Sequence, residues 1–296
     1  MTGPVLAAVA GVGFGAFQTL NRRAVGGMGD AYLATFLQLV VALGVLVVAT
    51  AATGGARDSF ESATARGVVL FALAGIVHFF VGWTLLNMSQ MRIGAARTSP
   101  LIATNPVWGA AIAVVAIHEL PRLVAWLGIA LVVAGALVIS LERVTETGWG
   151  ISWRDAAPGL ATAVAWAVSP VLIKEGLEGL ESPLAGLTLG MAVALAAYAL
   201  FLPFRPRPAA PRPLRWDAFS FKLAAGLLVG LSVWARWEAL ELADVAVVLA
   251  LGLLSVPVVM LLSPLLMGRH VERVDLRLWL GATLVVVGSL VLVVAA

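Results

Sequence analysis

The sequence contains no cysteine and few charged residues. Of its 296 residues, 12% are Asp, Glu, Lys or Arg, whereas 61% are hydrophobic. The absence of cysteine excludes disulfide bonds, thiol catalysis and cysteine-ligated metals. Soluble domains carry roughly twice this share of charged residues. A chain of this composition cannot hide its apolar surface from water, so we expect lipid to cover part of it.

Motifs of enzymes and metal sites are also lacking. The three histidines lie in separate segments without ligand spacing, so we expect no metal and no other cofactor. There is no HExxH motif and no aspartate-rich pair, which makes an integral membrane enzyme the least supported function. The net charge of +3 comes from arginines between apolar runs, which is typical of a membrane surface and not of nucleic-acid binding.

Long apolar runs fill most of the chain. A bilayer core of about 30 Å needs about 20 residues of helix. Nine runs meet this length, and a tenth, Leu223–Leu242, is counted although it contains Arg236, because the chain must return across the membrane between its neighbours. The predicted spans are approximately Pro4–Leu20, Tyr32–Ala52, Gly67–Met88, Ala95–Ala116, Leu123–Leu141, Ala156–Ile173, Leu184–Leu202, Leu223–Leu242, Val245–Met267 and Leu276–Val294.

The second half of the chain repeats residues of the first half in the same order. The aligned pairs are Trp83 with Trp234, Pro106 with Pro257, Glu119 with Glu272, Gly128 with Gly281 and Gly135 with Gly288, the last three after a two-residue insertion. The predicted halves are about 1–145 and 150–296, with five spans each. Because five is odd, the second copy enters the membrane upside down. We therefore predict an all-α membrane protein with ten transmembrane helices as two inverted five-helix repeats, an arrangement that places a site near the midplane between the halves.

A repeated motif connects this pattern to a known family. Pro106-Val-Trp-Gly-Ala is followed by Glu119 and by two spaced glycines in an apolar helix, and the series recurs from Pro257. Over its whole length the chain resembles the EamA-type ten-helix transporters of the drug/metabolite transporter superfamily. One departure is that the usual Gly-Glu pair reads His118-Glu119 and His270-Val-Glu272. The resemblance implies a carrier of amino acids, nucleobase-like metabolites, sugars or other small solutes.

Spans three and eight contain the most unusual polar residues. At positions i, i+4 and i+7, each span presents one helical stripe. These stripes are Trp83, Asn87 and Gln90 on span three, and Trp234, Glu238 and Glu241 on span eight. In one interpretation Glu238 binds a substrate ammonium or carries a proton, with the two tryptophans as cavity walls. In the other, Glu238 and Glu241 meet interfacial water and pair with Arg236.

Several other polar residues are candidates for the site. Arg236 points to another side of its helix than Glu238, where it binds a substrate carboxylate or extends to the interface. His78 either couples transport to protons or is a neutral histidine bonded to a neighbouring helix. Gln18 either links helices or lines a polar path. Asn105 coincides with a kink predicted at Pro106, and Trp166 with a similar Ser-Pro feature in span six.

Spaced glycines predict close helix packing and not nucleotide binding. Gly11 and Gly15 form a GxxxG contact within the first span. The pairs Gly128/Gly135 and Gly281/Gly288 lie seven residues apart and predict close-packed seams on spans five and ten.

Together these features predict a secondary transporter that moves a small polar metabolite, amino-acid-like or nucleobase-like, by alternating access. We expect spans one, three, four, six, eight and nine to line its path. The alternative is a translocase of lipid or lipid-linked sugar. The expected partners are a small-molecule substrate, the lipid bilayer and protons as a candidate coupling ion, in a monomer or homodimer of the cell membrane. Loop charges place both termini outside the cytoplasm, because 14 Lys/Arg lie in or directly beside the loops after the odd-numbered spans and four in the other loops, whereas the family resemblance implies cytoplasmic termini.

Overall fold

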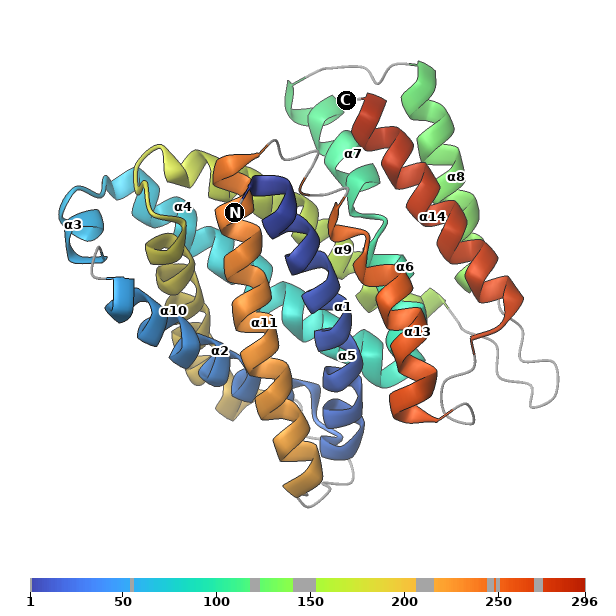
Figure 1. Ribbon diagram of the computed structural model, residues 1–296, viewed down its shortest axis with the longest axis horizontal. Coiled ribbons are helices and arrows are strands. Elements are labelled where there is room, and N and C mark those ends of the chain that lie inside the picture. The colour runs from blue at the N-terminus through green and yellow to red at the C-terminus, as the bar shows by residue number, and fades with distance from the viewer. Residues whose placement is uncertain are drawn as a thin grey trace.

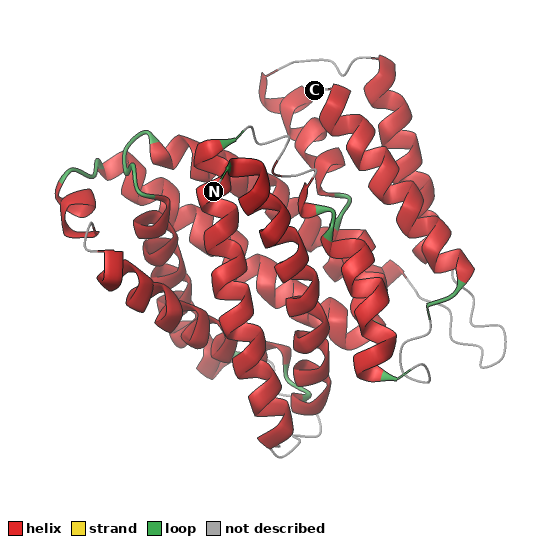
Figure 2. Ribbon diagram, in the orientation of Figure 1, coloured by secondary structure: helices red, strands yellow, loops and turns green. Residues whose placement is uncertain are grey.

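The structure, a computed structural model, describes residues 2–53, 56–117, 123–140, 153–205, 216–243, 248, 251–268 and 274–295. All regular secondary structure in these ranges is helical (Figure 2). The helices are α1 (Gly3–Met28), α2 (Ala31–Thr53), the short α3 (Ala56–Glu61), α4 (Ala65–Gly75), the π-helix η1 (Ile76–Gly82), α5 (Trp83–Ile93), α6 (Ala95–Ile102), α7 (Asn105–Ile117), α8 (Leu123–Ser140), α9 (Trp153–Leu177), α10 (Pro183–Phe201), the 3-10 helix η2 (Leu202–Phe204), α11 (Trp216–Leu242), α13 (Ser255–Met267) and α14 (Leu276–Ala295).

Every predicted span contains helix. Spans one, two and five to eight are α1, α2, α8, α9, α10 with η2, and α11. Span three is the continuous run α4–η1–α5, and span four is divided into α6 and α7. Spans nine and ten contain α13 and α14. The hairpin residues Glu119 and Glu272, and the histidines beside them, lie outside the described residues.

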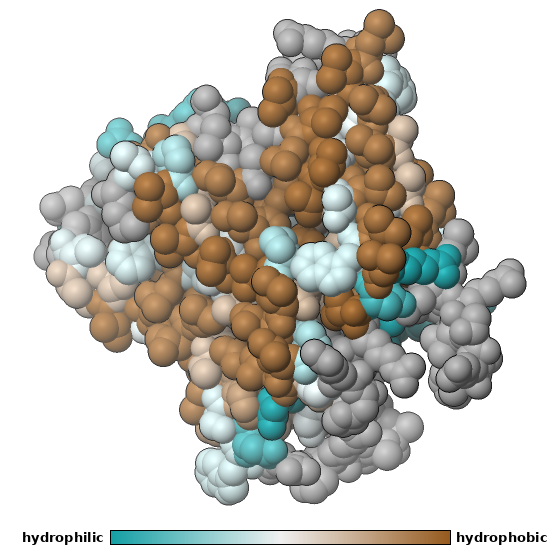
Figure 3. Space-filling model, turned by 45° about the vertical axis from the view of Figure 1, so that its right-hand side comes forward, coloured by the Kyte–Doolittle hydropathy of each residue, from teal (hydrophilic) through white to brown (hydrophobic). Residues whose placement is uncertain are grey.

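The outer surface is suited to lipid. Six helical stretches of the described chain are long and apolar enough to cross a membrane unaided. Large hydrophobic side chains such as Val48, Leu200 and Leu265 are 70% to 76% exposed, which would be unfavourable in water. Figure 3 shows one face of the molecule, where hydrophobic residues cover the middle and most hydrophilic ones gather toward its edges. The chain is an integral, multi-pass membrane protein.

The two halves of the chain are interlocked. α1 packs along α11, and the equivalent helices of the other copies, α9 and the run α4–η1–α5, pack in the same way. Similarly, α2 packs on α11, as α10 packs on α4. Figure 1 shows α1 and α11 side by side in the middle of the molecule. Each contact thus has a counterpart in which the first and second halves exchange places, as an inverted repeat requires.

The predicted glycine seams meet each other. α8 and α14 lie side by side at the upper right of Figure 1. A Cβ atom at Gly135 would lie 2.6 Å from the carbonyl oxygen of Gly281, and one at Gly288 would lie 2.7 Å from that of Gly128. Two helices approach this closely only where side chains are absent, so both seams belong to a single interface.

The GxxxG pair of α1 is also a helix contact. A Cβ atom at Gly15 would lie 2.8 Å from the carbonyl oxygen of Ser255, and one at Gly11 would clash with the carbonyl of Leu251. Gly11 and Gly15 therefore let α1 lie against the backbone at the start of α13, and the predicted contact is confirmed.

Two spans are interrupted near their middle. α6 ends at Ile102 and α7 begins at Asn105, so the kink predicted at Pro106 is confirmed. The second copy has the same interruption, a turn at residues 253–254 before α13 begins at Ser255. A proline follows within the first turn of each new helix, where its missing N–H does least harm. Hydroxyl groups supply donors to the first break: Ser289 Oγ donates to the Ala103 carbonyl at 2.9 Å, and Thr104 Oγ1 to that of Leu101 at 2.7 Å.

The π-helix η1 was not predicted. It occupies the middle of span three, and Gly82 ends it. A Cβ atom at Gly82 would lie 2.5 Å from Nε1 of Trp166, so this glycine leaves room for the indole of α9. π-helical turns inside α-helices are frequent at functional sites and change the facing of all residues that follow.

The glycine seam gives a first prediction. Gly288→Ala should lower the thermal stability of the detergent-solubilised protein, because the new methyl group overlaps the backbone of α8, and overpacking of this kind costs about 1–3 kcal/mol. The matched control is Gly44→Ala on α2, where a Cβ atom meets nothing within 4 Å. That change should leave the melting temperature unaltered or raise it, since alanine is the better helix former. Equal melting temperatures of the two variants would contradict the seam.

Candidate functional site

A cavity of about 40 Å³ lies where the two halves meet. It is bordered by α1, η1, α6, α7, α9, α11 and α13, and thus by the six spans named from the sequence. Both helix interruptions reach it, through Ala103 and Asn105 on one side and Leu253 and Ser255 on the other. We call it the central cavity. Its volume holds a few water molecules, so a solute needs some movement of the walls to enter.

Polar groups that lack partners face the central cavity. Nη2 of Arg236 is buried and has no hydrogen-bond partner, and Arg236 makes no ion pair with a described residue. Gln18 is 1% exposed; its Nε2 donates to Ser99 Oγ at 3.4 Å, and its Oε1 has no partner. Either orientation of this amide leaves one polar atom free. Unpaired buried polar groups are costly and are therefore good indicators of a ligand.

One wall of the central cavity is aromatic. The indole of Trp166 stacks on the His78 imidazole at 5.3 Å between ring centroids, and Phe14 meets Trp166 edge-on at 5.2 Å. His78 Nδ1 and Ser169 Oγ lie 2.8 Å apart, which ties η1 to α9. The Trp166 indole N–H donates to the His78 carbonyl at 3.2 Å. His78 thus has a partner on a neighbouring helix, while its ring still borders the cavity.

The stripe on α11 faces elsewhere. Trp234, Glu238 and Glu241 border a second hollow of about 680 Å³ between α1, α2, α10 and α11, which we call the outer hollow. Within it, the Trp234 indole donates to Glu238 Oε1 at 2.8 Å. Glu238 makes no ion pair with Arg236, which points into the central cavity instead. The i, i+4, i+7 stripe is real, but it lies on the opposite side of the helix from the cavity.

The stripe on α5 is closed inside the protein. Trp83 is fully buried against Phe79 and Phe17. Asn87 and Gln90 belong to a buried group that we call the polar cluster, which comprises Asn21, Thr35, Gln38, Asn87, Gln90 and Lys222.

Asn21 is the centre of the polar cluster. Its Nδ2 donates to Asn87 Oδ1 at 2.7 Å and to Gln90 Oε1 at 2.8 Å, and its Oδ1 accepts a bond from Nζ of Lys222. Lys222 also donates to Gln38 Oε1 at 2.7 Å. The cluster joins α1, α2 and α5 of the first half to α11 of the second, one helical turn beyond Gln18.

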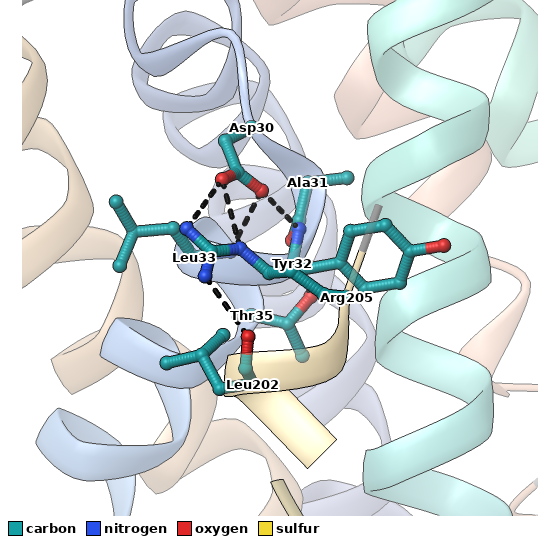
Figure 4. A network of polar contacts seen from close by, with 7 residues as sticks. All are labelled: Asp30, Ala31, Tyr32, Leu33, Thr35, Leu202 and Arg205. Carbon is teal, nitrogen blue, oxygen red and sulfur yellow. Dashed lines mark hydrogen bonds and ion pairs between the residues drawn. The ribbon is translucent and has the colours of Figure 1, made fainter. Parts of the chain in front are cut away.

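An ion pair lies at the same end of the bundle (Figure 4). Oδ2 of Asp30 accepts bonds from Nε and Nη2 of Arg205 at 3.1 and 3.0 Å, and Oδ1 accepts from the backbone N–H groups of Tyr32 and Leu33. Asp30 therefore caps the start of α2 and also binds Arg205, which follows α10 and η2. Like the polar cluster, this pair joins the two halves.

The structure thus divides the predicted site residues among three places. The central cavity has Gln18, His78, Asn105, Trp166 and Arg236. Trp234 and Glu238 border the outer hollow, and Trp83, Asn87 and Gln90 lie in the packed interior.

Sequence reasoning missed several groups. Phe14, Ser99 and Ser232 border the central cavity, but serine and phenylalanine are too common in membrane helices to be noticed. Lys222 precedes the predicted span Leu223–Leu242 by one residue, whereas it belongs to α11 and is 1% exposed. Its position between Phe221 and Leu223 was the available signal.

Comparison with known proteins gives a family match and matches to solved structures. The model of the EamA-like transporter family matches residues 1–141 and again residues 156–294. One solved structure, described only as a crystal structure of a protein, has a TM-score of 0.63 and 19% sequence identity to this chain. The match covers 98% of this chain and 95% of the chain in that structure. At that identity the likeness shows the fold alone. No curated protein matches the chain.

The polar cluster gives a second prediction. Asn21→Leu should lower the melting temperature strongly, because it removes one hydrogen bond from each of Asn87, Gln90 and Lys222, and an unpaired buried polar group costs about 1–3 kcal/mol. The control is Gln18→Leu, one turn away on the same helix and equally buried. Because Gln18 makes only one long bond, its replacement should change thermal stability little. A larger loss in Gln18→Leu than in Asn21→Leu would refute this division of roles.

Proposed function

The chain belongs to the EamA-like transporter family, and from this membership we propose that it is a secondary transporter that moves a small polar metabolite across the membrane by alternating access. The observation that supports the proposal best is the central cavity. It lies between the halves and is bordered by two interrupted helices, and irregular backbone at membrane depth is tolerated where it lines such a cavity.

The interlocked packing supports alternating access. α1 with α11, and α9 with α4–η1–α5, are two related helix pairs that enclose the same cavity. Movement within one pair opens a path on one side, and the related movement of the other pair opens a path on the opposite side. A single site is then accessible first from one side of the membrane and then from the other.

Contacts between the halves occur at both ends of the bundle. At one end they are the polar cluster and the Asp30–Arg205 ion pair. At the other end Arg66 of α4 pairs with Glu175 of α9, and the hydroxyls of Thr50 and Thr188 lie 3.0 Å apart. In the proposed cycle one set breaks while the other holds. The Arg66–Glu175 pair is exposed and suits this role, because such a pair contributes only about 0–1 kcal/mol.

A cavity-filling substitution tests the proposal. Gly252 borders the central cavity, and a Cβ atom there meets nothing within 4 Å. Gly252→Leu should therefore fill the cavity and reduce transport at least tenfold while the protein stays folded. Gly44→Leu is the matched control, because Gly44 has equally open surroundings but lies on α2, away from the cavity.

The measurement is solute counterflow in proteoliposomes, with separate pools of amino acids, organic acids, nucleobases, sugars and amines. We expect saturable accumulation from one pool, which is lost in Gly252→Leu and retained in Gly44→Leu. Labelled lipids are followed in parallel. If no pool moves while lipid crosses the bilayer, lipid translocation replaces the proposal. If both variants transport like the wild type, the central cavity is not the path.

A further inference from the structure

We propose that the central cavity binds the carboxylate of its solute, so that the transported metabolite is a small organic acid. This inference rests on the proposed function and names the substrate class. Its basis is that an unpaired guanidinium, two helix N-termini and an unpartnered amide converge on one small space.

The charge of the cavity is one-sided. Among the described residues that border it, Arg236 has the only permanent charge and none is acidic. Its Nη2 is buried without a partner. A buried charge without a counterion is destabilising, whereas the same charge beside a bound anion gains a charge-assisted hydrogen bond. The guanidinium therefore requires an anion that the described part of the chain does not supply.

The helix interruptions add to the positive potential. α7 begins at Asn105 and α13 at Ser255, and both residues border the cavity. The N-terminus of a helix bears about half of a positive elementary charge. Two such ends from opposite halves thus meet the cavity that contains Arg236. In interrupted transporter helices, these ends are suited to anionic substrate groups.

Gln18 provides an independent observation. It is almost completely buried, and one atom of its amide has no partner. Helix ends and arginines have other uses in proteins, but a free amide in the same cavity points to a missing polar ligand. The hydroxyls of Ser99, Ser232 and Ser255 border the same space and can donate to carboxylate oxygens.

The remaining wall limits the size and shape of the solute. Phe14 and Trp166 offer an aromatic surface for a flat or apolar part, and the cavity is small. The described acidic residues nearest in sequence, Glu238 and Glu241, face the outer hollow, where they do not repel a bound anion at short range. We therefore expect short or aromatic monocarboxylates to bind, in preference to their amides or to amines.

The test is counterflow with pools that differ in the polar group they carry: monocarboxylic acids, the corresponding amides, the corresponding amines and phosphate monoesters. The acids should accumulate at least tenfold faster than the amides and amines. Arg236→Gln should lower acid transport at least tenfold, and Arg236→Lys should retain part of it. The matched control is Arg92→Gln on α5, which removes an exposed arginine outside the cavity and should leave the selectivity unchanged.

A second measurement separates a binding residue from a structural one. Because Arg236 is unpaired, Arg236→Gln should not lower the melting temperature of the ligand-free protein. The acid pool should raise the melting temperature of the wild type but not that of Arg236→Gln. If ligand-free Arg236→Gln melts at a much lower temperature than the wild type, Arg236 has a structural role and the inference is overturned.

The outcomes distinguish the inference from the function on which it rests. If amides or amines move as fast as acids, or if Arg236→Gln transports acids normally, the carboxylate inference fails and the transporter stands. Preference for phosphate monoesters would replace carboxylate with phosphate and overturn the inference as stated. If no pool moves and no acid stabilises the wild type, both proposals fail.

Discussion

The backbone of a membrane protein must satisfy its own polar groups, because the bilayer core offers no water, and this constraint shapes the whole molecule. Most spans meet it by remaining helical throughout. The interruptions at residues 103–104 and 253–254 do not, and both are enclosed by other helices beside the central cavity. At the first interruption, the hydroxyl of Ser289 in α14 donates a hydrogen bond to the carbonyl of Ala103. The protein therefore accepts irregular backbone where that backbone borders an internal cavity.

Close packing follows from the same environment. Lipid tails are as apolar as leucine, so helices associate through short contacts and shared hydrogen bonds. The α8–α14 interface uses the first means, with glycines of each helix against the backbone of the other. The α1–α11 region uses the second, through Asn21 and Lys222. Rigid glycine contacts are suited to a support, and the α8–α14 pair lies at the side of the bundle (Figure 1). Hydrogen-bonded contacts between the halves can break and form again.

Much of the fold could be predicted from the sequence because span length, helix breaks and glycine spacing are local properties. The face that a helix turns inward is not local, and the site predictions show this limit. The stripe from Trp234 to Glu241 does share one side of α11, but it faces the outer hollow. On the equivalent span, the π-helix η1 precedes Trp83 and Asn87, so an ideal α-helical period does not describe their direction relative to His78. Neither result could be deduced from periodicity alone.

The buried polar residues of this protein differ in how fully their hydrogen bonds are satisfied. In the polar cluster, Lys222 and Asn21 are bonded, and the cost of burying them is offset by the hydrogen bonds they make across the halves. In the central cavity, Arg236 and Gln18 keep unused hydrogen-bonding capacity one helical turn or more away from that cluster. Stability does not explain the unpaired guanidinium of Arg236, because an unpaired buried group weakens a fold. Natural proteins accept such a loss at functional sites, where a ligand completes the missing bonds. Gln38 and Gln90 of the polar cluster also keep one unpartnered amide atom each, so a free amide alone does not mark a site. The charge of Arg236 and its position beside the central cavity are what support the proposed binding site.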